Sequence, residues 1–180
     1  MKIFKFLTIS FVLLFLSCKE DKPLTPTDEV ATVSTFYFIR HAEKDRSNSE
    51  NVDPELSQKG LGRAMHWAEI LNDVDLDVIY STDFNRTSMT AAPISVKKNI
   101  DVQYYDPRTI DIEQFKTENL GKKVLVVGHS NTTPDFVNKL IGEEKHKQID
   151  DSENGNLYMV QFVNNTVTDT KLVFNCNCPE

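Results

Sequence analysis

The stretch Phe36-Tyr37-Phe38-Ile39-Arg40-His41-Ala42-Glu43-Lys44 joins a predicted strand to a polar loop. Four apolar residues run directly into an arginine and a histidine, and the chain then becomes polar. A short apolar run that ends in a polar segment is typical of a buried strand. Because α/β proteins place functional groups where strands open into loops, we expect Arg40 and His41 to lie at the functional edge of a sheet.

Further apolar runs alternate with helical patterns along the chain. Val124–Val127 is apolar throughout, which is typical of a central parallel strand buried on both faces, and Gly128 and His129 follow it. The other expected strands cover about 34–40, 77–80 and 100–105, with a closing hairpin at 157–163 and 166–174. The expected helices begin near Ser57, Asn85, Asp111 and Pro134. The alternation predicts an α/β fold with a three-layer, doubly wound, mostly parallel sheet flanked by helices.

The first of these helices has an apolar periodicity that indicates how it packs. Apolar residues recur at helical spacing after Ser57, a plausible N-cap. They are Leu61, Ala64, Met65, Ala68 and Leu71. We therefore expect these five side chains to form the face that covers the sheet.

Residues 1–17 have the layout of a signal peptide, with a short basic start and an apolar run from Phe6 to Leu16. This run is too short to span a bilayer comfortably. Ser17-Cys18 resembles a bacterial lipoprotein cleavage site, which implies that Cys18 becomes the lipidated first residue. An ordinary secretory signal cleaved near Ser17 is the alternative. We expect an exported, membrane-anchored lipoprotein, periplasmic or on the cell surface, that meets the membrane only through Cys18.

The remainder of the chain divides into a tether, one domain and a tail. Residues 18–33 are charged and contain proline, so they predict a flexible tether. Residues 34–175 form the expected domain, and 176–180 form the tail. Cys176 and Cys178 would be able to pair in an oxidising compartment, although a bridge across one residue is strained. Other partners and a stray metal are alternatives, and we favour a frayed tail without function.

The charge balance limits the classes of partner. The chain carries 20 basic and 27 acidic residues, for a net charge of −7, and loss of residues 1–17 removes two lysines and makes it −9. This general field argues against binding of nucleic acid or of an anionic membrane. Local arginines would have to hold an anionic substrate. The sequence makes no prediction about the oligomeric state.

Three predicted strand ends carry functional side chains: Arg40-His41 follows the first, Arg86 lies after the second, and His129 follows Val124–Val127. Parallel strands end at the same edge of a sheet, so these residues are expected to converge. Two arginines and two histidines form a pocket for a dianion, since the arginine fork binds phosphoryl oxygens in a bidentate manner. No spacing typical of metal ligands is found in the sequence, and we expect no cofactor.

These residues stand in motifs that resemble those of the histidine phosphatase superfamily, which includes the cofactor-dependent phosphoglycerate mutases. The resemblance covers about residues 34–163 and includes four elements in order. They are Arg40-His41-Ala42, with alanine for the family's glycine, then Leu56-Ser57-x-x-Gly60, then Tyr80–Thr87 continuing to Thr90-Ala91, and finally Val127–Thr132. The resemblance implies a phosphoglycerate mutase-like fold and the activity of a phosphoric monoester hydrolase.

The resemblance also implies a mechanism for a small phosphorylated substrate. His41 attacks phosphorus and becomes a phosphohistidine. Arg40, Arg86 and His129 hold the phosphoryl oxygens and stabilise charge in the transition state. Ser47, or Asn48 beside it, takes the place of a polar residue with which the family contacts phosphate.

A carboxylic acid is needed to protonate the leaving group and then to activate water. The family places it after the third strand, where Asp106, Asp111 and Glu113 are available. We favour Asp106, because it follows the strand directly. Glu113 has the family's usual residue type, and Asp106 would otherwise be only a turn former. Without a positioned acid, activity would be confined to good leaving groups, including phosphohistidine.

Other functions remain open at this stage. A catalytically weak phosphate-binding lipoprotein would use the same arginines, and a phosphohistidine or sugar-phosphate phosphatase would use the same nucleophile. A mutase is less favoured, because the chain is short and lacks the insertions of the large mutases. A serine hydrolase is rejected, because Thr132 stands where the second glycine after Gly128-His129-Ser130 is required.

Overall fold

The structure, a computed structural model, describes residues 31–164 and 166–179. The predicted signal peptide, Cys18 and nearly all of the predicted tether lie outside the described residues. Within the described ranges, no helix is both long enough and apolar enough to cross a membrane.

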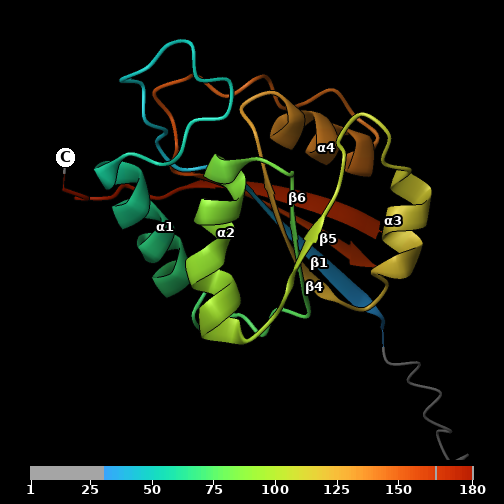
Figure 1. Cartoon of the computed structure of the whole chain (residues 1–180). Coiled ribbons are helices and arrows are strands. Elements are labelled where there is room, and N and C mark those ends of the chain that lie inside the picture. The colour runs from blue at the N-terminus through green and yellow to red at the C-terminus, as the bar shows by residue number, and fades with distance from the viewer. Residues whose placement is uncertain (1–30, 165, 180) are drawn as a thin grey trace, which may run out of the picture. The chain divides into compact units, whose positions relative to one another are not determined.

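A mostly parallel sheet runs through the middle of the domain (Figure 1). Its strands within the described residues are β1 (Val33–Arg40), β2 (Val78–Ser81), β3 (Val102–Tyr104), β4 (Lys123–Gly128), β5 (Asn156–Val163) and β6 (Thr166–Val173). Their order is β3-β2-β4-β1-β5-β6, in which the first four are parallel and β5 and β6 are antiparallel additions. The predicted parallel sheet is confirmed, with β4 in its interior and the closing hairpin at one edge.

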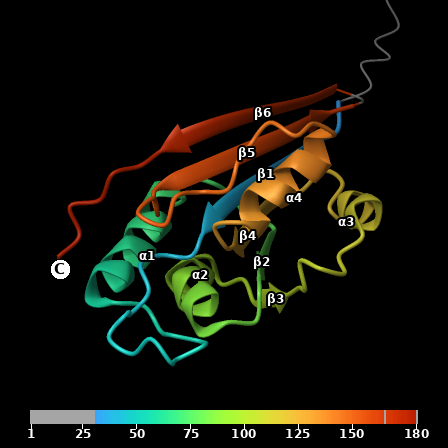
Figure 2. The same cartoon turned by 90° about the horizontal axis from the view of Figure 1, so that it is seen from above.

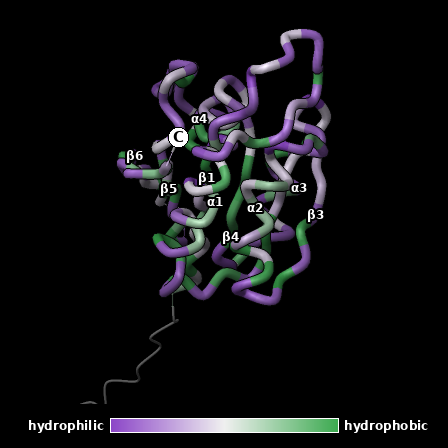
Figure 3. Tube along the Cα trace, turned by 60° about the vertical axis from the view of Figure 1, so that its left-hand side comes forward, coloured by the Kyte–Doolittle hydropathy of each residue, from purple (hydrophilic) through white to green (hydrophobic). Residues whose placement is uncertain are grey.

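Helices cover both faces of this sheet (Figure 2). They are α1 (Gln58–Ile70), α2 (Asn85–Lys98), α3 (Ile112–Glu118) and α4 (Thr132–Ile141). Side chains alternate along β1, so Phe36 and Phe38 pack with α3 and α4, whereas Ile39 packs with α1 and α2. The predicted three layers therefore have two cores, one on each face. Figure 3 shows hydrophobic residues gathered along the strands and hydrophilic residues in the loops at one end.

Helix α1 confirms the predicted cap but corrects the predicted packing face. The Ser57 side chain accepts a hydrogen bond from the Gly60 N–H at 3.1 Å. Leu61 and Met65, however, are 40% and 57% exposed, and Trp67 is fully buried. Trp67 is the larger apolar side chain, so the rotation that buries it against the sheet leaves Leu61 and Met65 at the rim.

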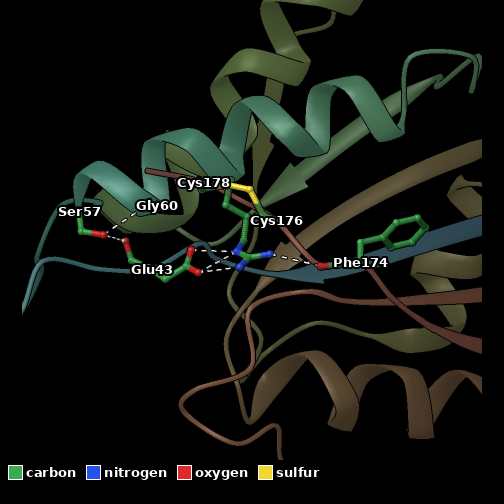
Figure 4. Close-up of a disulfide and its surroundings, with 7 residues drawn as sticks. Glu43, Ser57, Gly60, Phe174, Cys176 and Cys178 are labelled. Carbon is green, nitrogen blue, oxygen red and sulfur yellow. Dashed lines mark hydrogen bonds and ion pairs between the residues drawn. A yellow bond between two sulfur atoms is a disulfide. The ribbon is translucent and has the colours of Figure 1, made fainter. Parts of the chain in front are cut away.

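The C-terminal segment also differs from the expected frayed tail. Cys176 and Cys178 form a disulfide, and the segment lies against α1 (Figure 4). A Cβ at Gly62 would lie 3.1 Å from the Cβ of Cys178, so the absence of a side chain at Gly62 allows this approach. Cys176 and Cys178 are half-buried, whereas Asn175, Asn177 and Pro179 are exposed.

Candidate active site

The register of the parallel strands brings the predicted functional residues to one level of the sheet edge. Arg40 pairs with Gly128, and Ser81 pairs with Val127. The pattern continues beyond the strands, because the His41 N–H donates to the Gly128 carbonyl at 2.9 Å. His41 therefore emerges beside the residue that follows Gly128, and Thr82 emerges on the other side of β4.

A pocket of about 630 Å³ opens at this edge. Its lining includes Arg40, His41, Arg86, Asp106 and His129, so the structure brings these predicted residues together. The lining also includes Lys44, which follows the predicted nucleophile, and Thr82 and Phe84 of the motif Tyr80–Thr87. Sequence reasoning missed three further members of the lining, which are Tyr105, Arg108 and Asp151. Among the described residues, no group of three or more His, Cys, Asp or Glu side chains is placed to hold a metal ion, and the expectation of a metal-independent reaction stays a prediction.

Two predicted residues lie elsewhere. Ser47 lines a separate hollow in the loop after β1, where its N–H donates to the Asp45 carboxylate at 2.8 Å. This local turn holds Ser47 apart from the phosphate-binding candidates. Glu113 lies on α3, pairs with Lys116 at 3.1 Å and lines another hollow, beside Phe36. The structure does not place either side chain in the pocket with His41.

The His41 ring is held in the tautomer that a nucleophile requires. Nδ1 lies 2.7 Å from the Ala42 carbonyl oxygen. A carbonyl oxygen can only accept, so Nδ1 carries the proton and Nε2 keeps its lone pair. His41 is 4% exposed. Burial is the main cause that lowers the pKa of His41 to about 3, the hydrogen bond to Ala42 opposes the shift, and Arg40 adds to it. The ring is neutral at pH 7.

A chain of hydroxyl groups orients the second histidine. His129 Nε2 lies 2.8 Å from Thr82 Oγ1, and Thr82 Oγ1 donates to Thr87 Oγ1 at 3.1 Å. Arg86 Nη2 lies 3.4 Å from His129 Nδ1. Arginine can only donate, so Nδ1 is the acceptor and Nε2–H donates to Thr82. Burial first, and then Arg86, lower the pKa of His129 to about 4.

Phe84 and Thr90 fix the surroundings of Arg86. The Arg86 guanidinium lies 4.5 Å from the centre of the Phe84 ring, a cation–π contact. Thr90 Oγ1 donates to the Arg86 carbonyl at 2.7 Å and accepts from the Ala42 N–H at 2.9 Å. Thr90 thereby connects α2 to the turn that carries His41. Thr90 and Ala42 are 48 positions apart in the sequence. The motif that contains Thr90 therefore gives no sign of its contact with Ala42.

Arg40 is held by the loop that precedes β5. Its Nη1 donates to the carbonyl groups of Asp150, Asp151 and Glu153 at 2.8, 3.2 and 3.1 Å. Its Nη2 pairs with the Asp151 carboxylate at 2.5 Å. Its Nε is buried and has no partner. An oxygen of a bound phosphoryl group would satisfy this donor, which fits the predicted role of Arg40.

Asp106 lines the pocket as predicted, but it is held as a carboxylate. Arg108 binds it through Nε at 2.9 Å and Nη2 at 2.6 Å. These hydrogen bonds lower the pKa of Asp106 to about 2. In this state the side chain can accept a proton but cannot donate one. Its predicted role as the proton donor therefore requires that a substrate first change this pairing.

Comparison with known proteins supports the family that the sequence motifs suggested. The model of the histidine phosphatase superfamily (branch 1) matches residues 36–112, which include His41, Arg86 and Asp106. This match supports the predicted resemblance to the histidine phosphatase superfamily. Phosphoserine phosphatase 1 from Hydrogenobacter thermophilus is 38% identical over 80 residues, which are 42% of this chain and 37% of that protein. The match thus spans little more than a third of the curated relative. The family and this relative support the expected phosphoric monoester hydrolase.

Solved structures share the fold of this chain. The protein histidine phosphatase SixA complexed with tungstate superimposes with a TM-score of 0.63 at 14% identity, over 77% of this chain and 96% of that one. Phosphoglycerate mutase from Bacillus anthracis gives a TM-score of 0.60 at 16% identity, over 79% and 93%. The predicted phosphoglycerate mutase-like fold is confirmed.

Proposed function

We propose that this histidine phosphatase hydrolyses small phosphomonoesters without a metal ion, through a phosphohistidine on His41, and that it acts outside the cytoplasm. One observation carries the proposal: His41 is neutral, its Nε2 is unprotonated, and it lines a pocket with two arginines and a second histidine. This is the arrangement that attack on a phosphoryl group requires.

In the first step, His41 Nε2 attacks phosphorus and a nitrogen–phosphorus bond forms. The bond from phosphorus to the leaving oxygen breaks, and its electron pair leaves with that oxygen. The ring becomes positively charged, and the Ala42 carbonyl at Nδ1 stabilises this charge. Arg40 and Arg86 line the pocket, and we assign them to the phosphoryl oxygens; Arg86 would exchange its 3.3 Å pairing with Asp53 for this contact.

His129 joins this group after it gains a proton. Its Nδ1 accepts from Arg86 in the free protein. A bound phosphate dianion favours the charged ring, and Nδ1–H then donates to a phosphoryl oxygen. In the second step, water attacks phosphorus, the nitrogen–phosphorus bond breaks, and phosphate leaves with His41 neutral again.

The Asp106–Arg108 pair favours a second candidate, a phosphatase for phosphohistidine. A carboxylate that is already ionised gives little help to a poor leaving group, whereas an imidazole leaves more readily than an alkoxide. We keep Asp106 as the candidate acid for alkyl leaving groups, once a bound substrate has changed its pairing with Arg108, and as the base that activates water in the second step. A phosphate-binding lipoprotein with little catalysis is the remaining alternative.

The proposed location rests on residues 1–18 alone. An exported lipoprotein is attached through Cys18, and Cys18→Ala should move the protein from the membrane fraction to the soluble fraction. Equal membrane association of both proteins would exclude the lipid anchor.

The test of function uses the protein without residues 1–17 and p-nitrophenyl phosphate, with and without a chelator. We expect release of phosphate that the chelator does not change and that His41→Ala removes. The fold loss should be on the order of 10⁶, the scale for loss of a nucleophile. Equal activity of the two proteins would exclude the mechanism. Tight phosphate binding without turnover would favour the binding protein.

A further inference from the structure

Two residues after His41, Glu43 forms an ion pair with Arg63 of α1. Arg63 Nε lies 2.9 Å from both carboxylate oxygens of Glu43, and Arg63 Nη2 lies 2.8 Å from Oε1. The side chains are 9% and 20% exposed. The pair is therefore a bidentate, largely buried fork, and such pairs fix geometry more firmly than an exposed pair does.

The C-terminal segment also contacts Arg63, through Phe174, and Figure 4 shows Cys176 and Cys178 of this segment beside α1. Arg63 Nη1 donates to the Phe174 carbonyl at 3.4 Å, and the Phe174 N–H donates to the Gly155 carbonyl at 2.8 Å. The Phe174 ring packs on Trp67 of α1, with ring centres 5.7 Å apart. Arg63 is thus enclosed by α1, the turn after β1 and the end of the chain.

The backbone of Glu43 is anchored as well as its side chain. Its carbonyl oxygen accepts from the Ser57 N–H at 2.9 Å and from the Ser57 hydroxyl at 3.2 Å. A side chain at Gly60 would collide with this same carbonyl group, so glycine is required for the approach. Ser57, which Figure 4 shows beside Glu43 at the start of α1, and Arg63, further along α1, therefore hold Glu43 at two points.

These contacts act on the peptide group that sets the His41 tautomer. The Ala42 carbonyl that accepts from His41 Nδ1 belongs to the peptide between Ala42 and Glu43. On one side of this peptide, the Ala42 N–H is held by Thr90 at 2.9 Å. On the other side, Glu43 is held by Arg63 and Ser57. The two anchors therefore flank the carbonyl whose hydrogen bond leaves the lone pair free on Nε2.

We propose that Arg63 is a positioning residue for the nucleophile: through Glu43 it fixes the Ala42–Glu43 peptide, which holds His41 with its proton on Nδ1 and its lone pair on Nε2. This inference rests on the proposed function of His41 but makes a separate claim. Arg63 does not touch the substrate and lies outside the lining of the main pocket.

The experiment compares Arg63→Gln and Arg63→Lys with Leu71→Ala, all in the protein without residues 1–17. Leu71 is buried in the core beneath α1, so Leu71→Ala lowers stability without touching Glu43. Glu43→Gln keeps the shape of its side chain and serves as a second variant if Arg63→Gln does not fold. Turnover is measured well below each melting temperature. The His41 tautomer is read from the ¹⁵N resonances of its ring.

We expect Arg63→Gln to lower kcat on p-nitrophenyl phosphate by about 100-fold, the scale for a misplaced reacting group. Inhibition by inorganic phosphate, which reports Arg40, Arg86 and His129, should not change. Inhibition by vanadate, which bonds to the attacking nitrogen, should weaken. The His41 resonances should show a mixture of tautomers, Arg63→Lys should recover part of kcat, and Leu71→Ala should lower only the melting temperature.

The inference is overturned if Arg63→Gln keeps wild-type kcat and a single Nδ1–H tautomer, or if Leu71→Ala causes the same loss and the same mixture. Failure of the proposed function gives a different result, because wild type and His41→Ala would then be equally active. The tautomer measurement needs no turnover, so it tests the role of Arg63 even in that case.

Discussion

The two ends of the pocket are built in opposite ways. His41 follows β1, which is paired on both sides by β4 and β5, and the residue is 4% exposed with backbone and side-chain anchors around it. Asp106 follows β3, a three-residue edge strand, and its side chain is 38% exposed and paired with Arg108, which is 85% exposed. In the proposed mechanism, the fold therefore fixes the attack on phosphorus, whereas assistance to the leaving group depends on a surface loop.

The largest difference should appear when the exposed end is altered and the leaving group is varied. Asp106→Asn should lower kcat/KM for an alkyl phosphate by about 100-fold, the scale of general acid–base catalysis. The loss should be much smaller for p-nitrophenyl phosphate, whose leaving group needs little protonation. Both rates are measured by release of phosphate, and Glu113→Gln is the matched control. A larger loss in Glu113→Gln would transfer the assignment to that residue.

A change at the buried end should affect both substrates equally. Thr90→Val keeps the shape of the side chain but removes the hydrogen bonds to the Ala42 N–H and the Arg86 carbonyl. We expect kcat to fall by about tenfold, or 1.4 kcal/mol, for the alkyl and the aryl phosphate alike. Unfolding in urea should show a loss of about 1–3 kcal/mol, because a buried donor is left without a partner. A loss confined to the alkyl phosphate would remove the distinction between the two ends.

The smallest effect concerns pH. The pKa of His41 is lowered to about 3, whereas an unfolded histidine titrates near 6.5. Between these values the unfolded chain binds more protons, so the contribution of His41 makes stability fall as pH falls below about 6.5. From pH 7 to pH 5 the loss should be about 1–2 kcal/mol. Urea unfolding of His41→Ala should show a smaller decrease over that interval; an unchanged decrease would contradict the buried neutral ring.

The sequence predicted the functional residues that directly follow the strands. His41 and His129 directly follow apolar runs, so their convergence required only that those strands be parallel. The supports of these residues were not predictable in the same way. Thr90 on α2 contacts Ala42, which lies 48 positions away in the sequence. Asp151, in the loop before β5, contacts Arg40 at the end of β1, which lies 111 positions away.

The periodicity of apolar residues could not predict which face of α1 packs on the sheet, for a similar reason. Leu61 and Met65 share the helical spacing of the buried positions, and the burial of Trp67 decides between the possible faces. The loop around Ser47 is shaped by the hydrogen bond from the Ser47 N–H to Asp45, and no sequence motif predicted this bond. The contact of the C-terminal segment with α1 depends on the close approach of Cys178 to Gly62, two residues that are far apart in the sequence.

The central claim is that His41 Nε2 carries the phosphoryl group during turnover. The direct measurement is rapid quenching at high pH, where phosphohistidine survives, followed by mass spectrometry of the His41 peptide and ³¹P resonance of the denatured protein. We predict one phosphoryl group per chain on Nε2 of His41, and none in His41→Ala. A phosphoryl group on another residue, or turnover with none on His41 at any quench time, would contradict the account.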